Sequence, residues 1–319
     1  MAISAIKNKI TYLGESNHYA VYMSIFRVFT SLLLIKQIFN LWPYSSLLFG
    51  GQSFYIPPND VHSLLPINIL FVRHYFVIFY GAYMAALFLY LFGVGKNFTA
   101  LIVFLLFDLV QKLCPMILNG GDNLLKFLLL YMVFADSYQY LSISSKKITS
   151  VNGNFYNNFY SNIAGFCVCF QLCLIYFITA IHKIHSDVWF HGIATYYTLQ
   201  LDRFRGTTWN TLLVKNYFFV TVSTYFTLLV ELFYPTLVWF KSTKKFVIIG
   251  AILLHIGIYV FMMIYDFQLI FIATQGFFIS NRSWEKYLSS FRFQLNKITL
   301  WLTQFVARLT PKVIRHSNN

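Results

Sequence analysis

Residues 176–204 read YFITAIHKIHSDVWFHGIATYYTLQLDRF, and here a long apolar stretch ends in a group of ionisable side chains. Lys183 stands at the end of that stretch, and Asp187 and Trp189 follow it closely. The imidazoles of the same region are His182, His185 and His191. Ionisable side chains at membrane depth are costly and usually serve a purpose, so this stretch is the candidate functional site.

The composition is that of a multi-pass membrane protein. Of the 319 residues, 58% are hydrophobic and 11% are charged, whereas a soluble domain has about a quarter charged residues. Several apolar runs approach the roughly 20 residues that cross a bilayer as a helix. Runs of this length favour helices over a transmembrane barrel. We therefore predict an all-α integral membrane protein with about eight transmembrane helices and a C-terminal amphipathic interfacial helix.

Breaks that contain glycine, proline or asparagine separate the expected spans. The spans are placed near 21–42, 74–92, 98–113, 124–140, 162–184, 216–240, 246–264 and 267–279. The corresponding domains are a basic lead over 1–18, a membrane domain over 19–281 and a basic amphipathic tail over 282–319.

The tail is predicted to lie on the cytoplasmic membrane surface instead of crossing the membrane. Its apolar residues recur at helical spacing over 284–309, and Arg292, Lys297 and Arg308 occupy the other side of that helix.

The net charge of +14 is a topology signal, because the basic residues lie in short loops beside apolar spans. This distribution argues against nucleic acid as a partner. With the spans above, the strongly basic segments all fall on one side of the membrane. They are the N-terminus, Lys96, Lys146 and Lys147, Lys241, Lys244 and Lys245, and the tail. That side is expected to be the cytoplasm, so both termini are inside, and residues 43–69 and 185–215 face outward from the cell membrane.

The helix that carries Lys183 also places Tyr176 and Thr179 on the same face, since the three are spaced i, i+3 and i+7. We expect this face to line a cavity open to the outer side, and Cys167 and Leu174 to point elsewhere. Lys183 held away from bulk water would lose its proton more easily and could act as a base. The polar groups expected to reach it from other helices are Asp122, Arg27 and His255.

Simpler interpretations exist for the ionisable residues. Lys183 can snorkel to the interface, and Asp122 after Gly120-Gly121 can cap a helix. Arg27, Glu231 and His255 can be paired structural groups of the bundle, and an intramembrane arginine needs a carboxylate or carbonyl partner either way. The histidines and Asp187 lack the spacing of a zinc site, so no metal is predicted.

Several motifs, in this order, resemble the horizontally transferred transmembrane (HTTM) family and its relatives, the vitamin K-dependent γ-carboxylases. They are Phe26-Arg27, Leu91-Phe92-Gly93, Gly121-Asp122-Asn123-Leu124, Tyr176-Phe177-Ile178, His182-Lys183, Asp187, Trp189 and Leu254-His255-Ile256. The resemblance covers roughly residues 15–285.

The resemblance implies a role for Lys183 as the base that deprotonates a reduced quinone such as vitamin K hydroquinone. In the carboxylases, the resulting anion reacts with oxygen and becomes a stronger base, which removes a γ-proton from a peptide glutamate that then adds carbon dioxide. Asp122 and His255 are assigned to catalysis with Lys183. Substrate binding is assigned to Arg27, Tyr176, Thr179 and Trp189.

Two features depart from the carboxylase pattern. The carboxylases have a large extra-membrane domain after the spans, where this chain has a short basic helix. They also place a histidine before the fourth span, where this chain has Gly121-Asp122-Asn123. The alternative to a carboxylase-like enzyme is therefore a non-catalytic membrane partner in the export of, maturation of or immunity to a secreted peptide. A transporter is a third option, although internal repeats and broken midplane helices are not evident.

Overall fold

The computed structural model describes residues 2–55, 64–65, 67–143, 154–291, 293–294 and 297. It divides into two compact units, Met1–Phe278 and Ile279–Asn319. All regular secondary structure in the described residues is helical, which confirms the all-α prediction.

Each predicted span contains a helix. These helices are α2 (Ala20–Leu41), α5 (Phe76–Phe92), α6 (Lys96–Leu113), α7 (Gly120–Phe134), α8 (Phe155–Ile184), α12 (Tyr217–Leu237), α13 (Lys244–Met262) and α14 (Tyr265–Thr274). Four segments in the described part of the chain are long and apolar enough to cross a membrane: Ala20–Phe49, Phe155–Ile184, Tyr217–Leu237 and Lys244–Met262. With 10 residues, α14 is only about 15 Å long, roughly half the hydrocarbon thickness. The described residues thus contain four candidate spans, as expected of a helical membrane protein.

The segments expected as loops contain further short helices. The segment expected as a loop over 43–69 includes residues of η1 (Trp42–Tyr44), α3 (Ser45–Phe49) and α4 (Ile69–His74). Asp60 and His62 lie outside the described residues. The segment expected as a loop over 185–215 contains α9 (Asp187–Phe190), α10 (Ala194–Gln200), η3 (Asp202–Phe204) and α11 (Trp209–Leu213). The remaining 3-10 helices are η2 (Pro115–Ile117) and η4 (Gln275–Phe278). Side-chain hydrogen bonds hold the second segment in place, since Thr195 on α10 binds Thr224 and Ser223 on α12.

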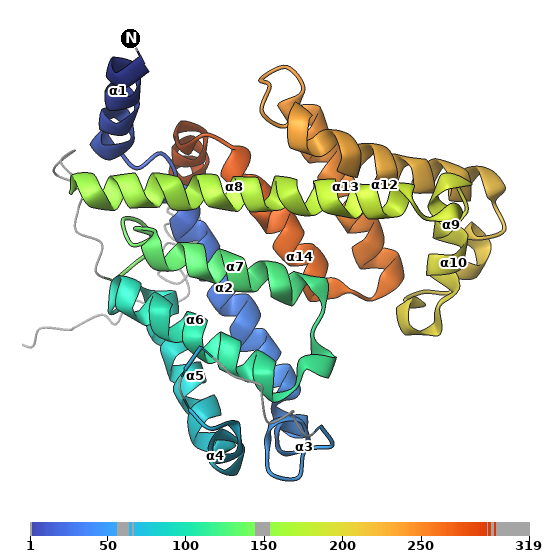
Figure 1. The fold of residues 1–319 in the computed structure, drawn as a ribbon, viewed down its shortest axis with the longest axis horizontal. Coiled ribbons are helices and arrows are strands. Elements are labelled where there is room, and N and C mark those ends of the chain that lie inside the picture. Colours follow the sequence, from blue (N-terminus) through green and yellow to red (C-terminus); the bar gives the residue numbers. More distant parts are fainter. Residues whose placement is uncertain are drawn as a thin grey trace, which may run out of the picture. The chain divides into compact units, whose positions relative to one another are not determined.

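The central helix of the first unit is α8, which has 30 residues and contacts α1, α7 and α12 (Figure 1). In this view α8 runs from left to right and α7 runs back beside it. The starts of α2, α6 and α8 lie toward the left, and the Lys183 end of α8 lies at the right. The first turns of α2, α6 and α8 therefore lie opposite the candidate site.

The basic lead forms a helix, α1 (Ala2–Glu15), that binds the first turns of α8. Asn158 donates to the Gly14 carbonyl at 3.0 Å, and Asn162 donates to the carbonyls of Leu13 and Ser16, both at 2.7 Å. The Leu13 and Gly14 carbonyls are among those that α1 leaves open at its end, and the Ser16 carbonyl follows directly after the helix.

The tail is described for only part of its length. Residues 281–291 are helical, and the predicted stripe beyond them lies almost entirely outside the described residues. Its predicted place on the membrane surface stays a prediction.

Arg27 is fully buried on α2 and binds backbone carbonyls. Its guanidinium donates to Tyr90 and Leu91 at the end of α5, both at 2.5 Å, to Ser137 at 3.1 Å and to Leu141 at 2.5 Å. A cation is favourable there, because the last carbonyls of a helix carry partial negative charge. The segment after α7 leaves the helix at Ala135, short of the predicted end at 140, and supplies two of the carbonyls that Arg27 binds.

Candidate functional site: Lys183, Glu231 and an apolar cavity

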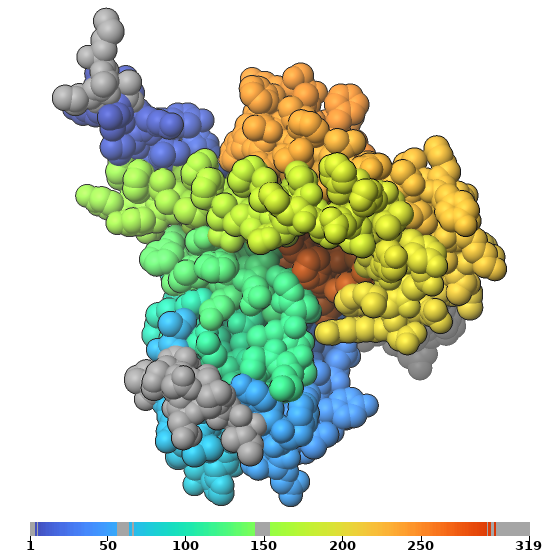
Figure 2. All heavy atoms as spheres, turned by 45° about the vertical axis from the view of Figure 1, so that its right-hand side comes forward, coloured from blue at the N-terminus to red at the C-terminus, as the bar shows by residue number. Residues whose placement is uncertain are grey.

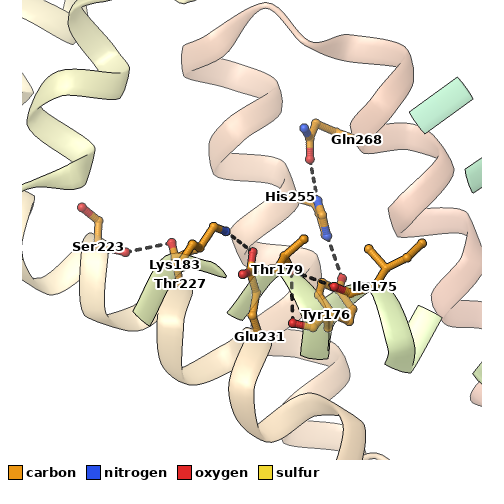
Figure 3. Close-up of polar contacts among 9 residues, drawn as sticks. All are labelled: Ile175, Tyr176, Thr179, Lys183, Ser223, Thr227, Glu231, His255 and Gln268. Carbon is orange, nitrogen blue, oxygen red and sulfur yellow. Dashed lines mark hydrogen bonds and ion pairs between the residues drawn. The ribbon is translucent and has the colours of Figure 1, made fainter. Parts of the chain in front are cut away.

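Lys183 lies in the last turn of α8 and forms an ion pair with Glu231 of α12 (Figure 3). The Lys183 side chain is 23% exposed and that of Glu231 is 9% exposed. The amine also lies over the Trp189 ring, 4.6 Å from its centroid, which is a cation–π distance. Lys183 therefore points into the protein, and the snorkelling interpretation does not describe its position.

The turn that joins α8 to α9 places Trp189 against Lys183. The helix ends at Ile184 with His185 as its C-cap, and Ser186 adopts an extended conformation before α9 begins. Gly192 then has φ = 73°, a conformation that favours glycine, and the hydroxyl of Tyr225 on α12 donates to the Phe190 carbonyl at 2.7 Å. The α9 turn is thereby fixed to α12, with Trp189 beside the amine.

A cavity of about 340 Å³ opens beside the Lys183 amine, between α10, α12 and α13. Its walls are mostly apolar, and its polar groups are Lys183 and the hydroxyls of Thr195, Thr198, Ser223 and Thr227. The other lining residues are Trp189, Leu199, Phe219, Phe226, Leu253, Leu254, Gly257, Ile258, Phe261 and Met262. Leu253 is 57% exposed and Phe226 is 38% exposed, so the cavity reaches the apolar outer surface of α12 and α13. Such a site suits a largely apolar ligand with one polar or ionisable group.

A buried hydrogen-bond chain lies next to the ion pair (Figure 3). Gln275 donates to the Tyr176 hydroxyl at 3.1 Å, the Tyr176 hydroxyl lies 2.7 Å from His255 Nε2, and His255 Nδ1 lies 2.5 Å from Gln268 Oε1. The Tyr234 hydroxyl extends the chain by donating to Gln275. Since the Gln268 oxygen can only accept, His255 Nδ1 carries hydrogen and Nε2 accepts from Tyr176. A neutral His255 is thus held in one tautomer.

The predicted face of α8 divides between these two clusters. Tyr176 binds His255, Lys183 binds Glu231, and Thr179 lies between them beside Glu231 (Figure 3). The Thr179 hydroxyl donates back to the Ile175 carbonyl at 2.9 Å. Leu174 is 37% exposed and faces away from the protein interior.

Asp122 forms a capping box with Asn119 at the start of α7. The Asn119 side chain accepts from the Gly121 amide at 2.8 Å and from the Asp122 amide at 3.3 Å, and the Asp122 carboxylate accepts from the Asn119 amide at 2.9 Å. Burial raises the pKa of the Asp122 carboxyl group. The expected glycine break is instead the first turn of α7, where a Cβ on Gly121 would lie 2.7 Å from the Phe267 backbone.

The structure therefore brings only part of the predicted set together. Lys183 and Trp189 line the cavity, whereas Tyr176, Thr179 and His255 do not, and Tyr176 and His255 bind each other. Asp122 caps α7, and Arg27 binds the end of α5. Within the described residues, no cluster of three or more His, Cys, Asp or Glu side chains is arranged to hold a metal ion.

Glu231 is the direct partner of Lys183, and the sequence did not identify that pairing. A glutamate inside an apolar span signals a buried partner, but several cations were available to it. The hydroxyl-bearing wall from α10 was also missed, because its residues lie in a segment expected to be a polar loop.

A second cavity, of about 540 Å³, is more polar and is lined by Lys36, Arg203, Asp266 and the Asn119–Gly120 turn, among others. Met262 lines both cavities. Lys36 and Asp266 form an ion pair at 2.5 Å. In Figure 2 the surface is hollowed between α8, α7 and the α9–α10 segment, and atoms of α14 form the floor.

Comparison with known proteins gave no match to a protein-family model, to a curated protein or to a solved structure.

Proposed function

We propose that this chain is a membrane enzyme, similar to the HTTM family and the membrane domain of the γ-carboxylases, that takes a proton from a quinol-like substrate. The observation that carries this proposal is the amine of Lys183 at the wall of an apolar cavity, paired with a buried carboxylate. The cavity accepts an aromatic ring among Trp189, Phe219, Phe226 and Phe261, and the amine is the ionisable group within reach of a ring hydroxyl.

The proposed step is a single proton transfer. A neutral Lys183 amine accepts the hydroxyl proton and becomes an ammonium, and the substrate becomes an oxyanion beside it. The ammonium then stabilises the oxyanion in surroundings that contain little water, where such interactions are strong. The substrate enters from the bilayer, because the cavity reaches exposed apolar side chains of α12 and α13.

Filling the cavity should block binding without harming the fold. Gly257 lines the cavity, and a Cβ built there meets no atom within 4 Å. We expect Gly257→Leu to weaken the binding of 1-naphthol, an aromatic probe with one ionisable hydroxyl, by about tenfold or more, or about 1.4 kcal/mol. Titration calorimetry of the protein in lipid nanodiscs measures this affinity.

Gly81→Leu is the matched control. Gly81 is also a helical glycine with open space around its Cβ, but it lies on α5 and does not line the cavity. Its affinity for naphthol should equal that of the wild type. Equal affinities for all three proteins would remove the cavity from the proposal, and failure of the wild type to bind would remove the quinol-like substrate.

We propose that the protein crosses the cell membrane about eight times, with both termini in the cytoplasm and the Lys183 end of α8 outside. Support comes from Lys96 at the start of α6, from Lys244 and Lys245 at the start of α13, and from the Lys183 end of α8, which lies opposite the starts of α2, α6 and α8. In a variant without native cysteines, Ser53→Cys should react with a membrane-impermeant thiol reagent on intact cells. Lys146→Cys should react only after lysis. The reverse labelling pattern would overturn this topology.

A non-catalytic membrane partner of a secreted peptide remains the second function. In that case the ion pair would only join α8 to α12, and the lysine would need no ligand. Naphthol binding that depends on the cavity favours the enzyme.

A further inference from the structure

We propose that Glu231 is the group that frees the Lys183 amine for proton transfer and stores the proton that Lys183 gives up. The inference rests on the proposed function and adds a residue to it. Glu231 does not line the cavity; it pairs with Lys183, which does, and would act through that lysine. Figure 3 shows the pair.

The two carboxylate oxygens of Glu231 differ in their surroundings. Oε1 accepts from the Lys183 amine, whereas Oε2 is buried and has no hydrogen-bond partner among the described residues. An unpaired buried charge is costly, and a carboxylic acid is much less so. The buried surroundings of Glu231 therefore favour the protonated acid more than the surroundings of an exposed carboxyl group do.

The proton movements balance within three groups. One proton passes from Lys183 Nζ to the Glu231 carboxylate, which leaves an amine and a carboxylic acid. The substrate hydroxyl then gives its proton to the amine. The products are an oxyanion, an ammonium and the acid, so no proton has left the site and the cavity holds an ion pair.

The other titratable groups that face the pair are not positioned to take this proton. The Tyr176 hydroxyl is directed to His255 Nε2, and His255 Nδ1 is directed to Gln268. Among the described residues there are three ion pairs, and only in the Lys183–Glu231 pair does the lysine line the apolar cavity.

The Asp108–Lys126 pair provides a matched control. Asp108, like Glu231, is buried, but both of its oxygens are partnered: Oδ1 by Lys126, and Oδ2 by the Leu64 backbone amide at 2.9 Å. It joins α6 to α7 away from the cavity. Replacing it breaks a buried ion pair without touching the proposed proton path.

Infrared spectroscopy of the naphthol-bound protein in nanodiscs tests the inference. The wild-type spectrum should contain the carbonyl band of a carboxylic acid, and that band should be lost in Glu231→Gln and retained in Asp108→Asn. If Glu231→Gln does not fold, Glu231→Asp should shift the band instead. A wild-type acid region equal to that of Glu231→Gln, or a band unmoved in Glu231→Asp, would overturn the inference.

The proposed function and the proposed role of Glu231 are refuted by different results. Naphthol that binds and ionises without an acid band from Glu231 refutes the role of Glu231 and leaves Lys183 as the base. Absence of naphthol binding to the wild type, measured by calorimetry, refutes both.

Discussion

Lys183→Ala is expected to lower the free energy of unfolding by about 3–5 kcal/mol, because it leaves the buried Glu231 carboxylate without its counter-charge. The double variant Lys183→Ala/Glu231→Ala should recover most of that loss, since no lone charge remains inside the protein. Reversible unfolding in mixed micelles of SDS and a mild detergent measures these differences. Double-mutant analysis then gives the coupling between the two residues.

The recovery in the double variant separates stability from function. The double variant should be folded and yet unable to ionise a bound naphthol. Additive effects of the two substitutions would show that the ion pair is not energetically coupled, contrary to the geometry of the site.

Arg27→Met is expected to lower the free energy of unfolding by about 4–5 kcal/mol, at the upper end for single substitutions. Methionine fills much of the volume but donates no hydrogen bond, so the carbonyls of Tyr90, Leu91, Ser137 and Leu141 lose a charged donor. Hydrogen bonds to charged groups contribute about 1.5–3 kcal/mol each, and relaxation recovers part of the total.

Arg205→Met is the control for this prediction, because Arg205 is exposed. It should change stability by less than about 0.5 kcal/mol in the same unfolding assay. If Arg27→Met were no more destabilising than Arg205→Met, the buried guanidinium would not hold the end of α5 as described. Arg27→Lys should recover little, since an ammonium cannot reach carbonyls arranged around a planar fork.

The sequence located a helix in every predicted span because a long, continuous apolar run is a strong signal, but only four segments of the described residues are long and apolar enough to cross a membrane. All eight apolar stretches contain a helix, and α8 ends at Ile184, the predicted last residue. The short elements α3, α4, α9, α10 and α11 were not predicted. They are too brief to show periodicity, and contacts such as those of Thr195 with α12 hold them in place.

Partners of buried polar groups were the least predictable feature. Arg27 required a carboxylate or a carbonyl, and its partners are backbone carbonyls, which every residue has and which leave no trace in the sequence. Lys183 was given Asp122, Arg27 and His255 as neighbours, yet its direct partner is Glu231 on α12. Which of several intramembrane carboxylates meets a given lysine depends on how the helices pack, and one sequence does not contain that information.

The most direct test of the account is the absorbance of 1-naphthol bound to the protein in nanodiscs at neutral pH. The wild type should show the naphtholate band, and the folded double variant Lys183→Ala/Glu231→Ala should show only neutral naphthol. The Asp108→Asn variant should behave as the wild type does. A naphtholate band of equal strength in the double variant, or its absence from the wild type with naphthol bound, would contradict the assignment of Lys183 as the base.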